Sequence, residues 1–272
     1  MKIYKEEFNK LLHLLKKGEP FSFSRFSDGE VTILRNRRLV LGNGFFIQGD
    51  IHGERPYQVP NNTYPQEERK DFDPAKDQFF QKKLTEAFKY RKKNYFKGIP
   101  PQNGGHDKDS SWHFCVDLYG EGDLKHLSFS NVMINDNYRF FVKDMLPVFK
   151  EKKVVLVSNE NSVLKDLPFD LVKHFPIGPN CLKSGYYLID ECKEWIKENE
   201  IEDHLFLFAA SSLSNLLCYE LYKDFDQNQY MDIGSSLGPY LKLKGWQGTR
   251  TYLHTFWSNP ENPPPQDVDI WN

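Results

Sequence analysis

Residues 204–215, HLFLFAASSLSN, join an apolar run to a serine-rich segment, and this stretch decides the fold class. The apolar residues 205–210 are too few for a helix and include two phenylalanines, which is typical of a strand buried on both faces. The polar segment Ser211–Asn215 follows, and a helix is predicted over 216–225. The order is therefore strand, polar loop, helix.

The same order occurs elsewhere in the second half of the chain. Residues 153–158, KVVLVS, form a continuous β-branched run that ends in a polar loop at 159–161. Residues 230–234, YMDIG, predict a third strand with a glycine stop, and an amphipathic helix is predicted over 186–198. Repeated strand–loop–helix units predict an α/β fold with a Rossmann-like, doubly wound, mostly parallel sheet.

Ligands of such sheets bind at the carboxyl ends of the strands. This rule selects three loops as candidate binding segments: 158–161, 211–215 and 234–236. Backbone N–H groups and the helix dipole at the start of the helix after 211–215 favour a phosphate. The cofactor-binding candidates in these loops are Ser211, Ser212, Ser214, Ser235 and Ser236. A plain serine N-cap is the alternative, although it accounts for only one serine of the 211–215 run.

Residues 21–30, FSFSRFSDGE, combine a strand with a charged turn. Alternating aromatic residues predict a strand with one buried face, and the chain then breaks at Asp28-Gly29. Carboxylates such as Asp28 and Glu30 hold Mg²⁺ or Mn²⁺, and a guanidinium such as that of Arg25 holds phosphate oxygens. The alternative is a strand end in which Asp28 caps a helix and Glu30 lies in its first turn. We expect both carboxylates to be solvated.

The string SRFSDGE resembles the Arg-Phe-Gly-Asp-Gly-Glu signature of the GT-D type glycosyltransferases, with Ser27 where that signature commonly has glycine. The resemblance implies a metal-dependent enzyme that moves a sugar from a nucleotide-diphosphate sugar, most simply a UDP-sugar, to an acceptor hydroxyl. It implies Asp28 and Glu30 as catalytic ligands of Mn²⁺ or Mg²⁺, with Ser24 and Arg25 beside the donor.

The resemblance covers roughly residues 20–54 and 150–255. The Asp232-Ile233-Gly234 step is similar to a step in the closing βαβ unit of that family, whose members usually carry glycine where this chain has Ser211 and Ser212. Asn180 lies where a family loop nears the nucleotide, which makes it a further cofactor-binding candidate.

Two other segments are candidates from their residues alone. Asp50 and His52 would project from one face of an extended segment, where either could act as a general base, although a solvated loop is the alternative. Residues 89–97, KYRKKNYFK, at the end of a helix predicted over 77–95, carry five positive charges and no negative one. The pattern fits a surface that binds phosphates and stacks bases, and it also fits a solvated helix C-terminus, which is the commoner case.

Composition limits the remaining classes. A chain of 272 residues with net charge −2 has no general attraction for polyanions. Its four cysteines are far apart in sequence, and no apolar run approaches the ~20 residues that span a bilayer. We expect one domain over 1–257, with a loop-rich helical insert at about 55–125 and a proline-rich tail at 258–272. The expected setting is the cytoplasm of a bacterium or of a virus- or phage-infected host cell.

The acceptor is open at this point: a glycan, a glycoprotein or a hydroxymethylated base of phage DNA. Two rival functions are a non-catalytic nucleotide-sugar binding module and a metal-dependent phosphohydrolase that uses the same carboxylates.

Overall fold

The computed structural model describes residues 4–42, 45–50, 53–58, 69–101, 111–120, 122, 124–134 and 137–242, with the backbone alone for 45–50 and 53–58. Its centre is a seven-stranded sheet in which every pairing is parallel. In spatial order the strands are β7 (Leu127–Phe129), β6 (Tyr95–Ile99), β1 (Phe21–Arg25), β11 (Gln229–Asp232), β10 (His204–Phe208), β8 (Lys153–Asn159) and β9 (Leu171–Ile177). The predicted α/β class is confirmed.

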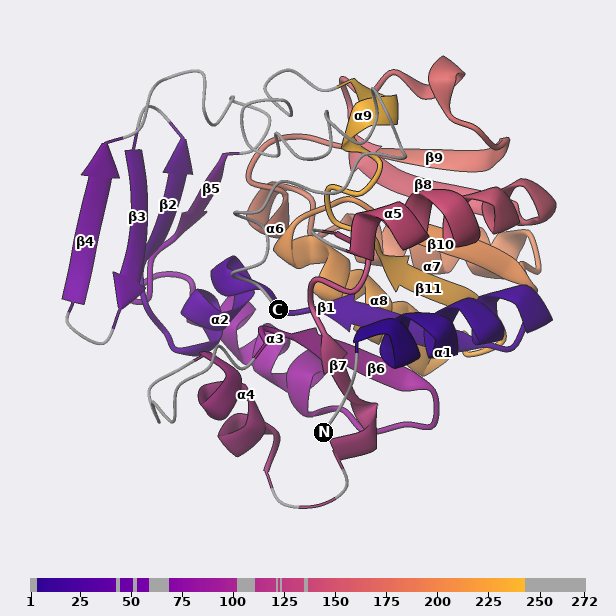
Figure 1. The fold of residues 1–272 in the computed structure, drawn as a ribbon. Coiled ribbons are helices and arrows are strands. Elements are labelled where there is room, and N and C mark those ends of the chain that lie inside the picture. The colour runs from indigo at the N-terminus through magenta and orange to yellow at the C-terminus, as the bar shows by residue number, and fades with distance from the viewer. Residues whose placement is uncertain are drawn as a thin grey trace.

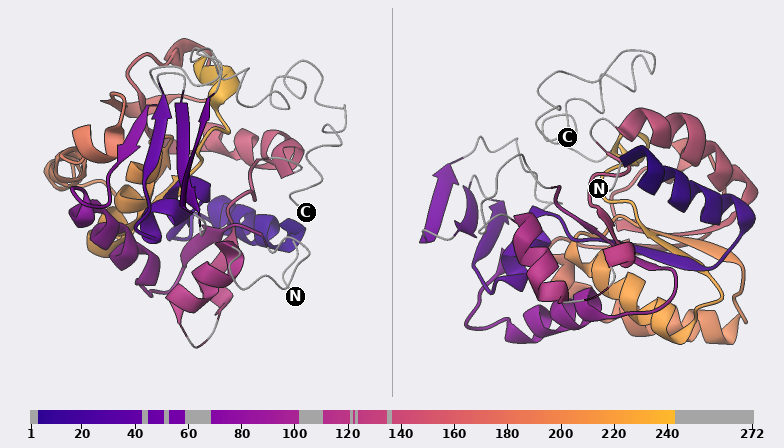
Figure 2. Two further views of the ribbon diagram at one scale, coloured as in Figure 1. Left: turned by 90° about the vertical axis from the view of Figure 1, so that its left-hand side faces the viewer. Right: turned by 60° about the horizontal axis from the view of Figure 1, so that its bottom comes forward.

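Helices cover both faces of this sheet (Figures 1 and 2). On one face lie α1 (Tyr4–Lys17), α5 (Tyr138–Phe140) with its continuation Phe141–Met145 and Leu146–Glu151, and α9 (Gly238–Leu241). On the other lie α2 (Asp28–Leu34), α3 (Gln78–Lys89), α4 (Ser111–Tyr119), α6 (Cys181–Ser184), α7 (Leu188–Glu198) and α8 (Ser212–Asp224). Short 3₁₀ turns are formed by Leu124–His126 and Leu164–Asp166.

Strand β1 lies in the middle of the sheet and is buried on both faces, so the expectation of one buried face is wrong. Phe21 and Phe23 belong to the core under α1, and their neighbours Ser22 and Ser24 face α8. Small hydroxyl side chains fit there because α8 itself supplies hydrogen-bonding partners for them. Ser22 donates to the Cys218 carbonyl at 3.1 Å.

The segment after α2 leaves the parallel sheet and forms a four-stranded antiparallel sheet. Its strands, in spatial order, are β4 (Gly53–Gln58), β3 (Phe45–Asp50), β2 (Leu39–Gly42) and β5 (Lys70–Phe72). The predicted helical insert at 55–125 is therefore misplaced. Beyond β5 the chain supplies α3, β6, α4 and the approach to β7, all of which belong to the central layers (Figure 1). Strand β6 was not predicted from the sequence, because its first residues belong to the basic–aromatic segment 89–97 that follows α3.

The strand order reverses between β1 and β11, and this switch point organises the site. Phe23 pairs with Met231, Asp232 with Phe208, and Phe208 with Val157, so the carboxyl ends of β1, β11, β10 and β8 lie along one edge. In Figure 1 the arrowheads of β1 and β11 point towards the antiparallel sheet. The three loops selected from the sequence begin at this edge.

Among the helices that the structure describes, none has both the length and the apolar character that a bilayer span requires. All four cysteines are buried as free thiols. Burial raises the pKa of Cys115 to about 12 and that of Cys181 to about 11, which makes these thiols poor nucleophiles near neutral pH.

Candidate active site

The turn from β1 into α2 is fixed by Ser27 and Glu30. Ser27 is the N-cap of α2, and its backbone N–H donates to Glu30 Oε2 at 3.1 Å as half of a capping box. The other carboxylate oxygen of Glu30 accepts from the Ser212 hydroxyl at 2.6 Å. Glu30 is thus buried and joins α2 to α8, whereas Asp28, the first residue of α2, is exposed. The expectation of two solvated carboxylates holds for Asp28 and is wrong for Glu30.

Arg25 ends β1 with a buried guanidinium. Its side chain is only 8% exposed; Nε donates to the Ser130 carbonyl at 2.5 Å, and an Nη donates to the Ser27 hydroxyl at 3.5 Å. Within the described part of the chain these neutral oxygens are its hydrogen-bonding partners, and no carboxylate forms an ion pair with it. A buried charge is costly unless it is paired, so this guanidinium is ready for an anion.

Asp232 at the end of β11 holds the switch point together, and the sequence analysis did not select it as a site residue. Its carboxylate accepts the Arg25 backbone N–H at 3.1 Å and the Gly234 N–H at 3.0 Å. Burial raises the pKa of Asp232 to about 7, against the opposing effect of the Arg25 guanidinium. The sequence feature that could have identified Asp232 is its position directly after Tyr230 and Met231, at the carboxyl end of a predicted strand.

In the serine-rich loop before α8, two of the serine hydroxyls proposed to bind a ligand form hydrogen bonds within the protein instead. Ser214 accepts the Ala210 N–H at 3.0 Å through its hydroxyl, and Ser212 is engaged with Glu30. Both side chains are buried. The N–H groups of Ser211 and Ser212 donate no hydrogen bond within the residues described, so they are the ones available to an anion. Ser211 adopts φ 49° and ψ −143°, a backbone conformation that favours glycine.

Asn180 links β5 of the antiparallel sheet to the edge at which the carboxyl ends of the parallel strands lie. Its N–H donates to the Arg69 carbonyl at 2.8 Å, and its side-chain oxygen accepts the Asp71 N–H at 3.0 Å. A small cavity of about 10 Å³, room for roughly one water molecule, is bordered there by Lys70, Asn180, Ser211 and Ser212 among others. Asn180, Ser211 and Ser212 therefore meet around one cavity, close to Glu30.

Ser24 and Ser236 do not reach the open edge. Ser24 accepts a hydrogen bond from Asn215 at 3.1 Å, on the α8 side of the sheet, and is fully buried. Ser236 is fully buried as well and donates to the Met133 carbonyl at 3.3 Å. Ser235 is half-buried, and its carbonyl accepts the Gly238 N–H at 2.8 Å. Ser24 and Ser236 have structural roles in this arrangement.

The two candidates for a general base fall largely outside the description. Asp50 is the last residue of β3, where it pairs with Gly53 on β4, and its side chain lies outside the described residues. His52 lies outside them altogether, as does the tail at 258–272.

No cluster of three or more His, Cys, Asp or Glu side chains suited to a metal occurs among the described residues. Such a cluster is not needed for a cation that arrives with a diphosphate, because Mg²⁺ is commonly held by one or two carboxylates, waters and substrate phosphates. The exposed Asp28 carboxylate fits that arrangement. Glu30 fits it less directly, since each of its oxygens already accepts a hydrogen bond.

The basic–aromatic segment 89–97 is remote from this edge, and its interpretation as a base-stacking surface is wrong. Tyr95 begins β6, so the segment lies at the amino ends of the strands, and both Tyr95 and Lys97 are fully buried. Lys92 forms an ion pair with Asp226 at 2.9 Å, and Arg91 stacks 4.3 Å from the ring centre of Tyr119. The aromatic rings belong to the core.

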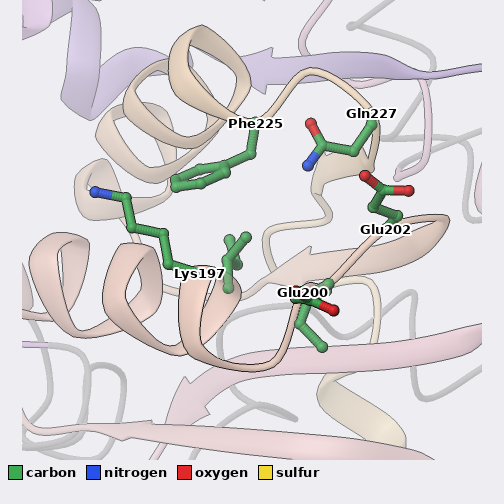
Figure 3. A pocket seen from close by; sticks show the side chains of 7 residues that line it. Lys197, Glu200, Glu202, Phe225 and Gln227 are labelled. Atoms are coloured by element: carbon green, nitrogen blue, oxygen red, sulfur yellow. The ribbon is translucent and has the colours of Figure 1, made fainter.

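A larger pocket of about 400 Å³ also lies at the amino-terminal edge (Figure 3). It is bordered by the end of α7, the segment before β10 and the segment after α8, with Lys197, Glu200, Glu202, Phe225 and Gln227 around it. It contains none of the predicted site residues, so its size does not make it the site.

With this geometry in place, the fold can be compared with known proteins. No protein-family model and no curated protein matches the chain. Among solved structures, one match is described as a highly conserved domain of unknown function 1792 with a distinct glycosyltransferase fold. It is 12% identical, covers 94% of this chain and 86% of that chain, and has a TM-score of 0.52.

Another match is described as a new glycosyltransferase (DUF1792) from Streptococcus sanguinis. It is 14% identical, covers 92% of this chain and 83% of that chain, and has a TM-score of 0.50. The chain therefore has the fold of domain of unknown function 1792, a distinct glycosyltransferase fold. The fold expected from the GT-D resemblance is confirmed.

Proposed function

We propose that this chain is a glycosyltransferase that moves a sugar from a nucleotide-diphosphate sugar, most simply a UDP-sugar, to an acceptor hydroxyl. The observation that carries the proposal is Arg25, a buried guanidinium without a carboxylate partner in the described structure, at the strand-order switch point. The two structural neighbours described as having a glycosyltransferase fold or activity support the same class.

A diphosphate would supply the negative charge that the neutral partners of this guanidinium do not provide. Arginine binds phosphate oxygens with two parallel N–H donors, and charge-assisted bonds of this kind are among the stronger ones in proteins. The N–H groups of Ser211 and Ser212 at the start of α8 would add neutral donors for the same anion.

In the reaction, the bond between sugar C1 and the oxygen of the second phosphate breaks, and its electron pair stays on the nucleoside diphosphate. The acceptor oxygen forms the new bond to C1 and loses its proton to a base, for which Asp50 and His52 remain the proposed groups. Negative charge grows on the leaving diphosphate, and preorganised donors aimed at such charge are usually the largest catalytic contribution. Arg25 would supply that stabilisation.

We also propose a divalent cation, Mn²⁺ or Mg²⁺, held by Asp28, with Glu30 as a second ligand or as the group that fixes the turn. When bound, the cation would act as a Lewis acid that offsets the charge of the diphosphate. Asp28 is exposed and can face a ligand without any rearrangement of the core.

For the acceptor we favour a glycan or glycoprotein over a hydroxymethylated DNA base. The only local feature that favoured DNA was segment 89–97, whose aromatic side chains Tyr95 and Phe96 are buried. Segment 89–97 also lies at the sheet edge opposite to the proposed donor site.

Thermal unfolding with a panel of nucleotide sugars, with and without Mn²⁺, tests the donor site. A donor at 100 times its Kd stabilises a protein by about 2.7 kcal/mol, enough to raise the Tm by several degrees. We expect one nucleotide sugar to do this selectively and to release its nucleoside diphosphate slowly in the absence of acceptor. Arg25→Lys should lose most of the shift, because an ammonium does not reproduce the guanidinium fork.

Thermal unfolding and nucleoside diphosphate release, together with an assay of simple phosphate esters, separate the rival functions. A binding module would show the thermal shift without release of nucleoside diphosphate. A phosphohydrolase would cleave simple phosphate esters, which a transferase leaves intact. Absence of any nucleotide-dependent shift would overturn the proposal.

A further inference from the structure

We infer that Lys70 is a second cation of the proposed donor site, that its ammonium contacts the diphosphate, and that Asn180 is the residue that positions it. The inference rests on the proposed function and extends it to the antiparallel sheet. Lys70 begins β5, a strand that belongs to the antiparallel sheet and not to the parallel one.

The Lys70 ammonium points at the charged turn. If Gly29 carried a side chain, its Cβ would lie 3.7 Å from Lys70 Nζ and 3.5 Å from the Leu39 side chain. Gly29 stands between Asp28 and Glu30, so the ammonium lies close to the backbone of the α2 turn. Lys70 also borders the same small cavity as Ser211 and Ser212.

Among the residues that the structure describes, Lys70 has no partner that would account for its position. Within the described residues it forms neither an ion pair nor a side-chain hydrogen bond, although it is half-buried. Glu30 is nearby: both it and Lys70 influence the Cys181 thiol, Lys70 lowering and Glu30 raising a pKa that burial has already raised. The two oxygens of Glu30 are nevertheless engaged with Ser27 and Ser212. The three ammonium donors of Lys70 therefore remain available to a ligand.

Asn180 holds the backbone on both sides of Lys70. Its N–H binds the carbonyl of Arg69 and its side-chain oxygen binds the N–H of Asp71, the residues immediately before and after Lys70. Asn180 adopts φ 55°, a left-handed conformation that asparagine tolerates better than most residues. This pair of bonds fixes the point from which the Lys70 side chain leaves β5.

A diphosphate is the ligand class that this arrangement fits. The cavity holds only about one water molecule, so the anion would lie at its mouth, where it could contact Lys70 and the Ser211 and Ser212 N–H groups. An ammonium is a compact point charge suited to an oxyanion, and it would add a second cation to the fork of Arg25.

Calorimetric titration with inorganic pyrophosphate and with UDP, each in the presence of Mg²⁺, tests Lys70. We expect Lys70→Met to weaken both by about tenfold or more, the usual effect of losing a charged hydrogen bond. Lys70→Arg should retain most of the affinity. Lys76→Met is the matched control: it removes the same charge from a side chain that is 81% exposed and paired with Asp73, and it should bind like the wild type.

Asn180→Gly tests the positioning role, because glycine keeps the left-handed backbone and removes the side chain whose oxygen binds the Asp71 N–H. We expect it to weaken pyrophosphate binding several-fold in the wild-type background and to have no further effect in the Lys70→Met background. A merely structural role would lower affinity equally in both backgrounds.

The outcomes separate this inference from the proposed function. Unchanged binding of pyrophosphate and UDP by Lys70→Met, with a wild type that binds both, would overturn the role of Lys70 and leave the glycosyltransferase proposal intact. A wild type that binds neither ligand would overturn both.

Discussion

The Arg25 guanidinium packs directly on the backbone of Gly234. A Cβ built on Gly234 would lie 1.7 Å from Arg25 Nη1, a distance at which the two atoms cannot coexist. Gly234 also has φ 50°, which is strained for any residue with a side chain. A glycine at position 234, two residues after Asp232, is therefore required by the position of Arg25 on β1.

Gly234→Ala should displace the guanidinium and abolish most binding of a nucleoside diphosphate, measured by calorimetric titration. Gly120→Ala is the matched control, because Gly120 also has a positive φ (85°) but a Cβ there meets nothing closer than Arg91 Nη2 at 4.0 Å. Both variants carry the backbone strain, and only Gly234→Ala should lose binding. Equal affinities in the two variants would contradict the role given to Arg25.

Asp28→Asn and Glu30→Gln should separate chemistry from stability. Asp28 is exposed, so its replacement should change the free energy of unfolding by less than about 0.5 kcal/mol while abolishing metal-dependent turnover. Glu30→Gln weakens two charge-assisted hydrogen bonds and should lower that free energy by about 1 kcal/mol. Urea unfolding and Mn²⁺ titration of donor hydrolysis measure the two effects. Full activity of Asp28→Asn at limiting Mn²⁺ would remove Asp28 as a ligand.

Ser211→Gly should stabilise the protein. The conformation of Ser211 costs on the order of 1–3 kcal/mol for a residue with a Cβ, and the added freedom of glycine in the unfolded chain offsets part of the gain. We expect a net increase of about 1 kcal/mol in the free energy of unfolding. The same replacement one residue later, Ser212→Gly, should instead destabilise, since it removes the hydroxyl that binds Glu30. A stabilised Ser212→Gly would show that this bond is unimportant.

Because Lys97 is buried, the free energy of unfolding should rise with pH between about 7 and 10.5. This lysine is fully buried against the rings of Tyr95 and Tyr119, donates to the Tyr90 carbonyl, and burial lowers its pKa to about 7 from 10.5. Between these two values the unfolded chain binds a proton that the folded protein does not. The free-energy penalty for burying Lys97 is therefore complete below pH 7 and decreases as the pH rises towards 10.5.

Lys97→Met removes the penalty and should raise the free energy of unfolding by roughly 2–4 kcal/mol at pH 7, but by much less at pH 10. Urea unfolding of both proteins at a series of pH values gives the difference directly. A difference that does not change with pH would show that Lys97 keeps an ordinary pKa in the folded protein.

Local sequence determined the elements and the general place of the site. The β-branched and aromatic runs at 153–158 and 204–208 form strands because short apolar segments of this composition pair well in a buried sheet, and helix α1 follows from apolar spacing alone. The turn at Ser27–Glu30 also forms locally, since its capping box joins two residues that are only three positions apart. Strand β6 was missed because a strand of five buried residues with Lys97 inside it has no local signature.

Tertiary structure alone decided which polar groups meet. Arg25 and Asp232 are 207 positions apart, Glu30 and Ser212 are 182 apart, and Asp71 and Asn180 are 109 apart. Neither periodicity nor spacing reports such pairs, because they depend on the strand order and on the antiparallel sheet that brings Lys70 to the edge. The charge types at the candidate site could therefore be predicted from residues 21–30. The burial of Glu30, the burial of Arg25 beside neutral oxygens and the approach of Lys70 follow from long-range packing.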